Sequence, residues 1–126
     1  MKKRNILATI LTLVLVVTIF SSMAVPAFAS TTGETEGKVW AFYDDDFDSA
    51  WELYVAGDSG RASLTYGYNT FLIHEDYAWA SHSTKEHHAE IITTNGTYTG
   101  PTKAAGKVSK KEIMHLAFEI FYFNFY

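Results

Sequence analysis

The chain after residue 37 consists of short apolar stretches separated by glycines. β-Branched and aromatic residues are frequent in these stretches, as is typical of short strands joined by turns. The strands expected from this pattern cover residues 38–43, 50–56, 61–73 and 77–83. The pattern therefore predicts a fold made of β-strands.

The clearest turn signal is Asn95-Gly96, within EIITTNGTYTGP. These two residues can occupy the two positive-φ positions of a type I′ turn. The threonines and the tyrosine on either side favour extended strands. The sequence predicts a hairpin of strands 88–94 and 97–102, with positive φ at both Asn95 and Gly96.

The last nine residues, FEIFYFNFY (118–126), include six aromatic side chains. Alternation divides this segment into two faces: Phe118, Ile120 and Tyr122 on one, and Phe121, Phe123 and Phe125 on the other. We expect the first face to lie in the core. Because the second face is also apolar, the segment is typical of a strand inside a sheet.

Two alternatives remain for this region. Ser109-Lys110-Lys111-Glu112 has the form of a capping box, so a helix over 110–120 competes with the strand that we favour. The second aromatic face either packs under the segment around Trp40 and Trp51, which we favour, or stays open as an apolar patch for a lipid-linked ligand. An exposed segment of this kind would aggregate. We therefore predict an all-β domain, a small antiparallel β-sandwich with the last strand inside it.

The first 29 residues have the pattern of a signal peptide helix. A basic start precedes the apolar run 6–20, and Ala27 and Ala29 form an A-x-A cleavage site. We predict cleavage between Ala29 and Ser30 and a secreted, extracellular protein, with an uncleaved membrane helix over Ile6–Val25 as the alternative. The expected layout is a signal peptide over 1–29, a flexible tail over 30–37 and one β-sandwich domain over 38–126.

Charge and cysteine content narrow the partners of such a domain. Of ten basic residues, three leave with the signal peptide, so seven remain against fourteen acidic residues and the formal charge becomes −7. This charge disfavours nucleic acid and other polyanions. The chain has no cysteine, so neither disulfides nor thiol chemistry are expected, and stability must come from packing.

Candidate metal and catalytic residues are few. Asp44, Asp46 and Asp48 have the alternation of a calcium loop, but Ser49 and Val55 stand where an EF-hand needs glycine and glutamate. His82, His87 and His88 could bind zinc with Glu86 or Glu90. However, adjacent His87 and His88 point to opposite faces of an extended strand. We expect no metal, no cofactor and no catalytic residue, with a glycosidase-like carboxylate pair as a minor alternative.

Several segments resemble the lactococcin 972 family of bacteriocins. They are SHSTKEHHA (81–89) with Ile91-Ile92 after it, AAGKVSK (104–110), the terminal FYFNFY (121–126), and Glu36-Gly37 with Trp40. Val108 stands where the family would have a tryptophan. The resemblance covers residues 77–126 well and 38–76 hardly at all.

The resemblance implies a secreted, unmodified antimicrobial protein with a β-sandwich of two small antiparallel sheets. The family's type member binds the cell-wall precursor lipid II and blocks septum formation, which implies a cell-envelope target and dedicated immunity or transport proteins in the producer. Stable membrane insertion after signal cleavage is not expected, and the protein can be a monomer or a homodimer. The target can differ, because the charge of −7 and the longer N-terminal half depart from the family.

The residues expected to contact the target or to form the core are Trp79, Phe121, Phe123 and Phe125. The alternative function is that of a secreted, non-catalytic β-domain used for adhesion or ligand binding.

Overall fold

The computed structural model describes residues 30–44 and 47–126. Their strands are β1 (Ser30–Thr35), β2 (Lys38–Tyr43), β3 (Trp51–Gly57), β4 (Ala62–Asn69), β5 (Glu75–His82), β6 (His88–Thr93), β7 (Gly96–Thr99), β8 (Val108–Met114) and β9 (Ile120–Phe125), with the short 3-10 helix η1 (Asp58–Gly60). Within the described part of the chain, no helix has the length and hydropathy needed to cross a bilayer. The predicted signal peptide lies outside the described residues.

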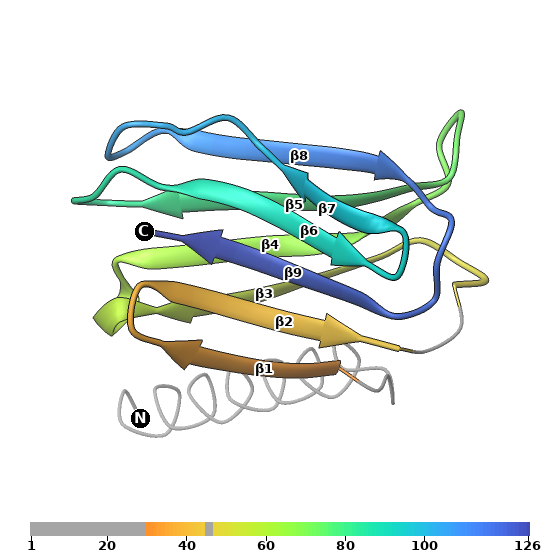
Figure 1. Ribbon diagram of the computed structural model, residues 1–126, viewed down its shortest axis with the longest axis horizontal. Coiled ribbons are helices and arrows are strands. Elements are labelled where there is room, and N and C mark those ends of the chain that lie inside the picture. Colours follow the sequence, from red (N-terminus) through yellow and green to blue (C-terminus); the bar gives the residue numbers. More distant parts are fainter. Residues whose placement is uncertain (1–29, 45–46) are drawn as a thin grey trace, which may run out of the picture.

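The strands form two antiparallel sheets that pack face to face (Figure 1). The five-stranded sheet has the order β1-β2-β9-β6-β7, and the four-stranded sheet has the order β3-β4-β5-β8. The predicted all-β sandwich of two small antiparallel sheets is therefore confirmed. The expected strands 38–43, 50–56 and 77–83 correspond to β2, β3 and β5 within two residues at each end.

The core lies between the two sheets and is rich in tyrosine. The ring of Tyr43 stacks on Trp51 with centroids 4.0 Å apart, and the ring of Tyr66 lies 5.0 Å from that of Tyr122. Small inward residues of β5 lie beside larger ones of β4: Ala78 pairs with Tyr66 and Ala80 with Leu64, and both alanines are completely buried. Alternation of large and small inward residues lets the two sheets interdigitate without disulfides.

The C-terminal region forms strands, as we favoured, and no helix occurs over 110–120. However, the strand expected over residues 118–126 begins only at Ile120, where β9 starts. β8 belongs to the four-stranded sheet and β9 to the five-stranded sheet, so the chain crosses between the sheets at residues 115–119. Phe118 lies in this crossing and is 67% exposed, whereas we expected it in the core.

β9 occupies the interior of its sheet, between β2 and β6. Its inward residues are Ile120, Tyr122 and Asn124, all fully buried. The Asn124 side-chain amide donates hydrogen bonds of 2.8 Å to the carbonyl oxygens of Ser63 and Ser81 in the other sheet. A buried amide paired in this way ties the two sheets together at one position.

The flexible tail expected over 30–37 is a second correction. Residues Ser30–Thr35 form β1, which pairs with β2 over six residue pairs. Strand pairing uses backbone groups that every residue except proline carries, and threonine is a good strand former. A polar composition therefore did not exclude an edge strand.

The hairpin is present, but its turn is displaced from the predicted position. Thr93 pairs with Gly96, so Thr94 and Asn95 form the loop. Gly96 has φ of +149°, whereas Asn95 is not among the described residues with positive φ. The Asn95 N–H instead donates to Thr93 Oγ1 at 3.1 Å. This local side-chain acceptor favours a loop one residue earlier than the Asn-Gly signal indicated.

Candidate functional site

The outer face of the five-stranded sheet carries a group of aromatic side chains that the core does not use. Cross-strand pairing sets the rows Lys38–Phe125–His88, Trp40–Phe123–Glu90 and Phe42–Phe121–Ile92 across β2, β9 and β6. We call Trp40, Phe42, Phe121, Phe123 and Phe125 the aromatic face. Its residues alternate with buried ones along each strand, as the two-residue period of a strand requires.

The rings of the aromatic face lie nearly parallel along β9. The centroids of Phe121 and Phe123 are 6.1 Å apart with 19° between ring planes, and those of Phe123 and Phe125 are 5.2 Å apart with 22°. The imidazole of His88 continues the row, 5.2 Å from Phe125 and tilted by 18°. The result is a continuous row of ring surfaces on a strand held from both sides.

Trp40 extends this surface over the neighbouring strand β1. Its cross-strand partner there is Gly33, and a Cβ at Gly33 would lie only 2.3 Å from the indole ring. The indole therefore lies across β1 in space that only glycine leaves free. A small residue in an edge strand thus fixes the orientation of the largest ring of the face.

Polar groups border the rings. Lys38 Nζ lies 5.8 Å from the ring centroid of Phe123 and 5.7 Å from that of Phe125. The Glu90 carboxylate accepts a hydrogen bond of 3.2 Å from Thr99 Oγ1. A hollow of about 220 Å³ opens beside Lys38, Trp40 and Phe123. Such a surface suits a ligand that presents apolar rings or chains together with anionic or hydroxyl groups.

The structure brings together three of the four predicted contact or core residues. Phe121, Phe123 and Phe125 share the aromatic face, and Phe121 is 39% exposed. Trp79 lies on the outer face of the other sheet, where Lys110 Nζ is 4.5 Å from its ring. None of the four belongs to the core cluster.

The rings are partly buried, with Phe121 the most exposed at 39%, but the covering that we favoured for them is wrong. Trp51 faces inward and stacks on Tyr43, so it cannot cover the rings of β9. Trp40 lies beside Phe123, not above it, since the two are cross-strand partners. The sequence reasoning also missed Lys38, Glu90 and Gly33 as parts of this surface. Only cross-strand register, which the sequence does not show, places them there.

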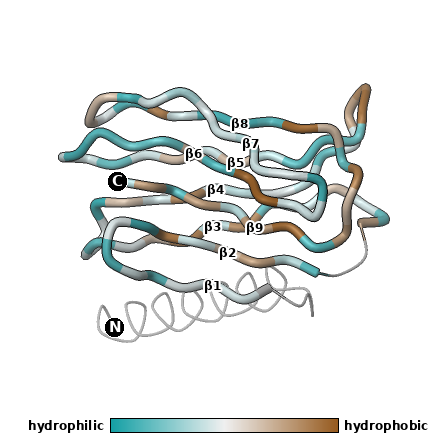
Figure 2. The backbone as a smooth tube through the Cα atoms, viewed as in Figure 1, coloured by the Kyte–Doolittle hydropathy of each residue, from teal (hydrophilic) through white to brown (hydrophobic). Residues whose placement is uncertain are grey.

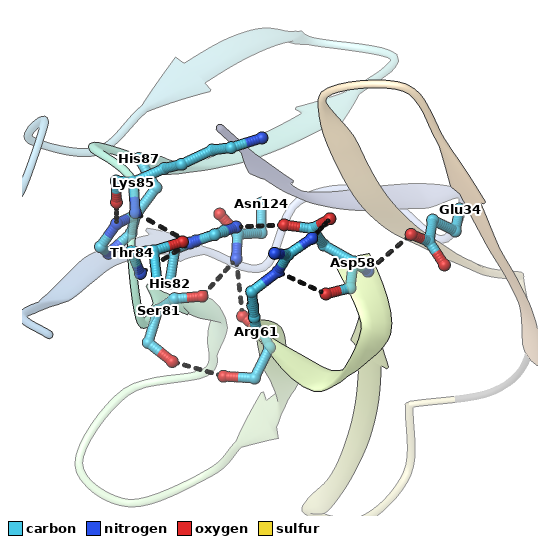
Figure 3. A network of polar contacts seen from close by, with 10 residues as sticks. Glu34, Asp58, Arg61, Ser81, His82, Thr84, Lys85, His87 and Asn124 are labelled. Atoms are coloured by element: carbon cyan, nitrogen blue, oxygen red, sulfur yellow. Dashed lines mark hydrogen bonds and ion pairs between the residues drawn. The ribbon is translucent and has the colours of Figure 1, made fainter. Parts of the chain in front are cut away.

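A second polar cluster lies at the end of the sandwich near η1 (Figure 3). His82 Nε2–H donates to Asp58 Oδ2 at 2.8 Å, while His82 Nδ1 accepts from the backbone N–H groups of Thr84 and Lys85. Hydrogen bonds to Arg61 and His82 lower the pKa of Asp58. Both nitrogens of this buried imidazole are engaged, so it has no free position with which to take a proton from a substrate.

His87, one of the histidines considered for zinc, is also fully engaged. Its Nδ1 lies 2.9 Å from the carbonyl oxygen of Lys85, and its Nε2 lies 2.8 Å from that of Lys107. His87 is buried, whereas His88 lies on the outer face against Phe125, so the predicted opposite orientation of the two is confirmed. Among the described residues, no three His, Cys, Asp or Glu side chains gather in a way that could hold a metal.

Asp76 and His115 form a polar pair at the end of the sandwich opposite η1. Asp76 is completely buried, and both of its carboxylate oxygens lie 2.9 Å from His115 Nδ1. Burial raises the pKa of Asp76 from its ordinary value of 3.8 to about 6, and the hydrogen bond from His115 opposes part of this rise. The His115 ring is enclosed by Phe47, Tyr68 and Phe118. The pair therefore anchors the crossing between β8 and β9.

This pair makes the stability dependent on pH. A carboxyl group whose pKa is higher in the folded chain binds its proton more tightly there, so Asp76 should favour folding increasingly as the pH falls from about 7 towards about 4. Carboxyl-carbon NMR should give an Asp76 titration midpoint near pH 6. A midpoint near 4 would mean that the carboxylate is not desolvated. The melting temperature of the parent should therefore rise as the pH falls from about 7 towards about 4. In Asp76→Asn this contribution to the rise should be absent.

Comparison of the chain with protein-family models, with curated proteins and with solved structures finds no match. The class of protein is defined by the structure itself: a cysteine-free antiparallel β-sandwich with a partly exposed aromatic face. The likeness to lactococcin 972-type bacteriocins rests on the sequence segments alone.

Proposed function

We propose that this chain is a secreted antimicrobial protein, similar to the lactococcin 972-type bacteriocins, that binds a cell-envelope target through its aromatic face. The observation that carries the proposal is the row of nearly parallel, partly exposed rings on β9 beside Lys38. A monomeric domain seldom exposes a contiguous aromatic patch without a ligand or partner for it. The mode of action is binding without catalysis.

Lipid II is the first target to test, because it combines the chemical groups that this surface suits. Its sugar rings and prenyl chain offer apolar surface for the aromatic face, and its pyrophosphate offers an anion for Lys38. A lysine beside aromatic rings on a half-dry surface pairs more strongly with an anion than a lysine in open water. Thr99 and Glu90, at the far side of Phe123, supply hydroxyl and carboxylate partners for sugar hydroxyls.

The formal charge of −7 expected for residues 30–126 is consistent with a target that is recognised by shape and stacking. General attraction to anionic envelope polymers would require a basic surface. The producer then needs export of the protein and an immunity function against it, as the resemblance implies.

Growth inhibition tests the proposal. The exported protein should inhibit bacteria related to its producer and delay septum formation. Trp40→Ala combined with Phe123→Ala should lower inhibition by about a hundredfold, since each ring contributes about 1.4 kcal/mol to a stacked complex. Trp79→Ala is the matched control, because Trp79 is a partly exposed tryptophan on the opposite sheet. It should leave inhibition unchanged.

The melting temperature of each variant shows whether it is folded. Lost inhibition in a variant that melts like the parent supports the aromatic face as the contact surface. Unchanged inhibition in the folded double variant contradicts it. A parent that inhibits none of the related strains favours the adhesion or ligand-binding alternative.

A further inference from the structure

The end of the sandwich opposite η1 carries a separate group of exposed apolar side chains. They come from the β4–β5 loop (70–74) and the β8–β9 loop (115–119), and we call them the apolar tip: Phe71, Leu72, Ile73, Leu116 and Phe118. Their exposed fractions are 79%, 88%, 48%, 69% and 67% in that order. Figure 2 shows hydrophobic colour at the β4–β5 loop, which projects beyond the sheets. The tip belongs neither to the core nor to the aromatic face.

The two loops form one surface. The backbone N–H of His115 donates to the carbonyl oxygen of His74 at 2.9 Å, which joins the loops at their bases. A hydrogen bond of 2.6 Å between Tyr68 Oη and His74 Nδ1 fixes the β4–β5 loop to a buried residue of β4. These two hydrogen bonds at the bases of the loops hold the exposed side chains at the end of the domain.

The backbone of the β4–β5 loop is strained in the way that exposes Leu72. The N–H of Ile73 donates to the carbonyl oxygen of Phe71 at 2.8 Å, and Leu72 between them has φ of +66°. This is the γ-turn with positive φ at its centre, which is rare and costly for a leucine. The Asn69 side chain supports it by accepting from the Phe71 N–H at 3.2 Å. Strain that presents a leucine to solvent indicates a use for that leucine.

The preceding part of the chain reaches the domain at this same end. Ser30 pairs with Tyr43 and Tyr43 pairs with Ile120, so the start of β1 lies beside the point where the β8–β9 loop enters β9 (Figure 1). The sequence before Ser30 contains the apolar run 6–20, which has the composition of a segment that enters a membrane. Until the predicted cleavage after Ala29, this run is therefore joined to the domain at the end that carries the apolar tip.

From these observations we infer that the apolar tip docks the domain end-on to a lipid bilayer, by inserting its side chains among the acyl chains at the interface. Projecting loops suit insertion, because a bilayer needs no complementary groove. The lipid is zwitterionic, since Glu75 and Glu119 flank the tip and would be repelled by anionic headgroups. The inference is independent of the aromatic face and of its target.

Single cysteines test the docking, because the chain has none of its own. Leu72→Cys places a polarity-sensitive dye at the tip, and Val108→Cys places it at the opposite end of β8, where Val108 is also exposed. On addition of phosphatidylcholine vesicles without any cell-wall precursor, the dye at 72 should brighten several-fold and the dye at 108 should not change. Equal responses at both positions, or none at 72, would overturn the proposal.

A second pair of variants measures the strength of docking. Leu72→Ser with Phe118→Ser should weaken vesicle co-sedimentation by about a hundredfold, about tenfold for each side chain. Val108→Ser, at an exposed apolar residue of the opposite end of β8, should leave it unchanged. At about 1 M salt the Debye length is only about 3 Å, so interactions between exposed charges are screened. Docking by apolar side chains should not weaken under this condition. Loss of binding in high salt, or dye brightening that accompanies dimer formation without vesicles, would contradict lipid insertion.

Discussion

Tyr122→Ala is expected to unfold this protein or to bring it close to unfolding. Tyr122 is completely buried at the centre of β9, with the rings of Tyr66 and Trp51 at 5.0 and 6.3 Å. Truncating a buried aromatic side chain costs about 3–5 kcal/mol, and the whole margin of a small domain is about 5–15 kcal/mol. Without disulfides, nothing covalent offsets the loss. Chemical denaturation should show the midpoint falling by about half or more.

Two control variants, Phe121→Ala and Tyr122→Phe, test whether the loss of stability in Tyr122→Ala comes from removing a buried ring. Phe121→Ala removes an adjacent ring that points to the outer face and is 39% exposed, so it should cost only about 1 kcal/mol. Tyr122→Phe keeps the buried ring and removes a hydroxyl for which no hydrogen-bond partner is found among the described residues, so stability should be kept. Equal losses for Phe121→Ala and Tyr122→Ala would contradict the assigned orientation of β9.

The terminal segment shows how far periodicity leads. The two-residue alternation correctly separated Ile120 and Tyr122 from Phe121, Phe123 and Phe125. It did not show where the chain changes sheets, because residues 115–119 continue the apolar pattern although they form a loop. Leu116 and Phe118 are exposed there. The type of a residue does not show whether it lies in a loop or in the core, because this depends on the residues around it in the folded chain.

Local turn chemistry was less informative than strand pairing. Asn95-Gly96 marked the hairpin correctly but not its register. The expected strand 61–73 was too long, since β4 ends at Asn69 and Phe71–Ile73 form the strained turn. A run of Phe, Leu and Ile favours a strand by propensity. Here the hydrogen bond from the Phe71 N–H to the Asn69 side chain stops it.

The candidate site was predicted in part. Three phenylalanines were recognised from the sequence as one face, with an open patch as the less favoured use. Lys38, Trp40 and Glu90 join that face through long-range pairing across β2, β9 and β6. Such pairing depends on register between distant segments, which a single sequence does not specify. His87 and His88 were correctly separated in orientation, but the partners of His87 are backbone carbonyl groups that no motif indicates.

The second large effect concerns the ligand. Trp40→Ala with Phe123→Ala removes two neighbouring rings at the centre of the aromatic face while leaving the core untouched. If each ring contributes about 1.4 kcal/mol or more, affinity for the target should fall by about a hundredfold. Gly33→Ala should weaken binding in the same direction, since its Cβ would displace the indole of Trp40. Trp79→Ala, which removes a ring from the other sheet, is the control and should leave the affinity unchanged.

Isothermal titration of the exported protein with lipid II in detergent micelles tests the central claim most directly, because micelles remove any contribution from a bilayer. We predict saturable binding by the parent and by Trp79→Ala, and binding weakened by about a hundredfold in the folded Trp40→Ala, Phe123→Ala variant. Equal affinity of the folded double variant and the parent, or no binding of lipid II by the parent, would contradict the proposal that the aromatic face recognises this target.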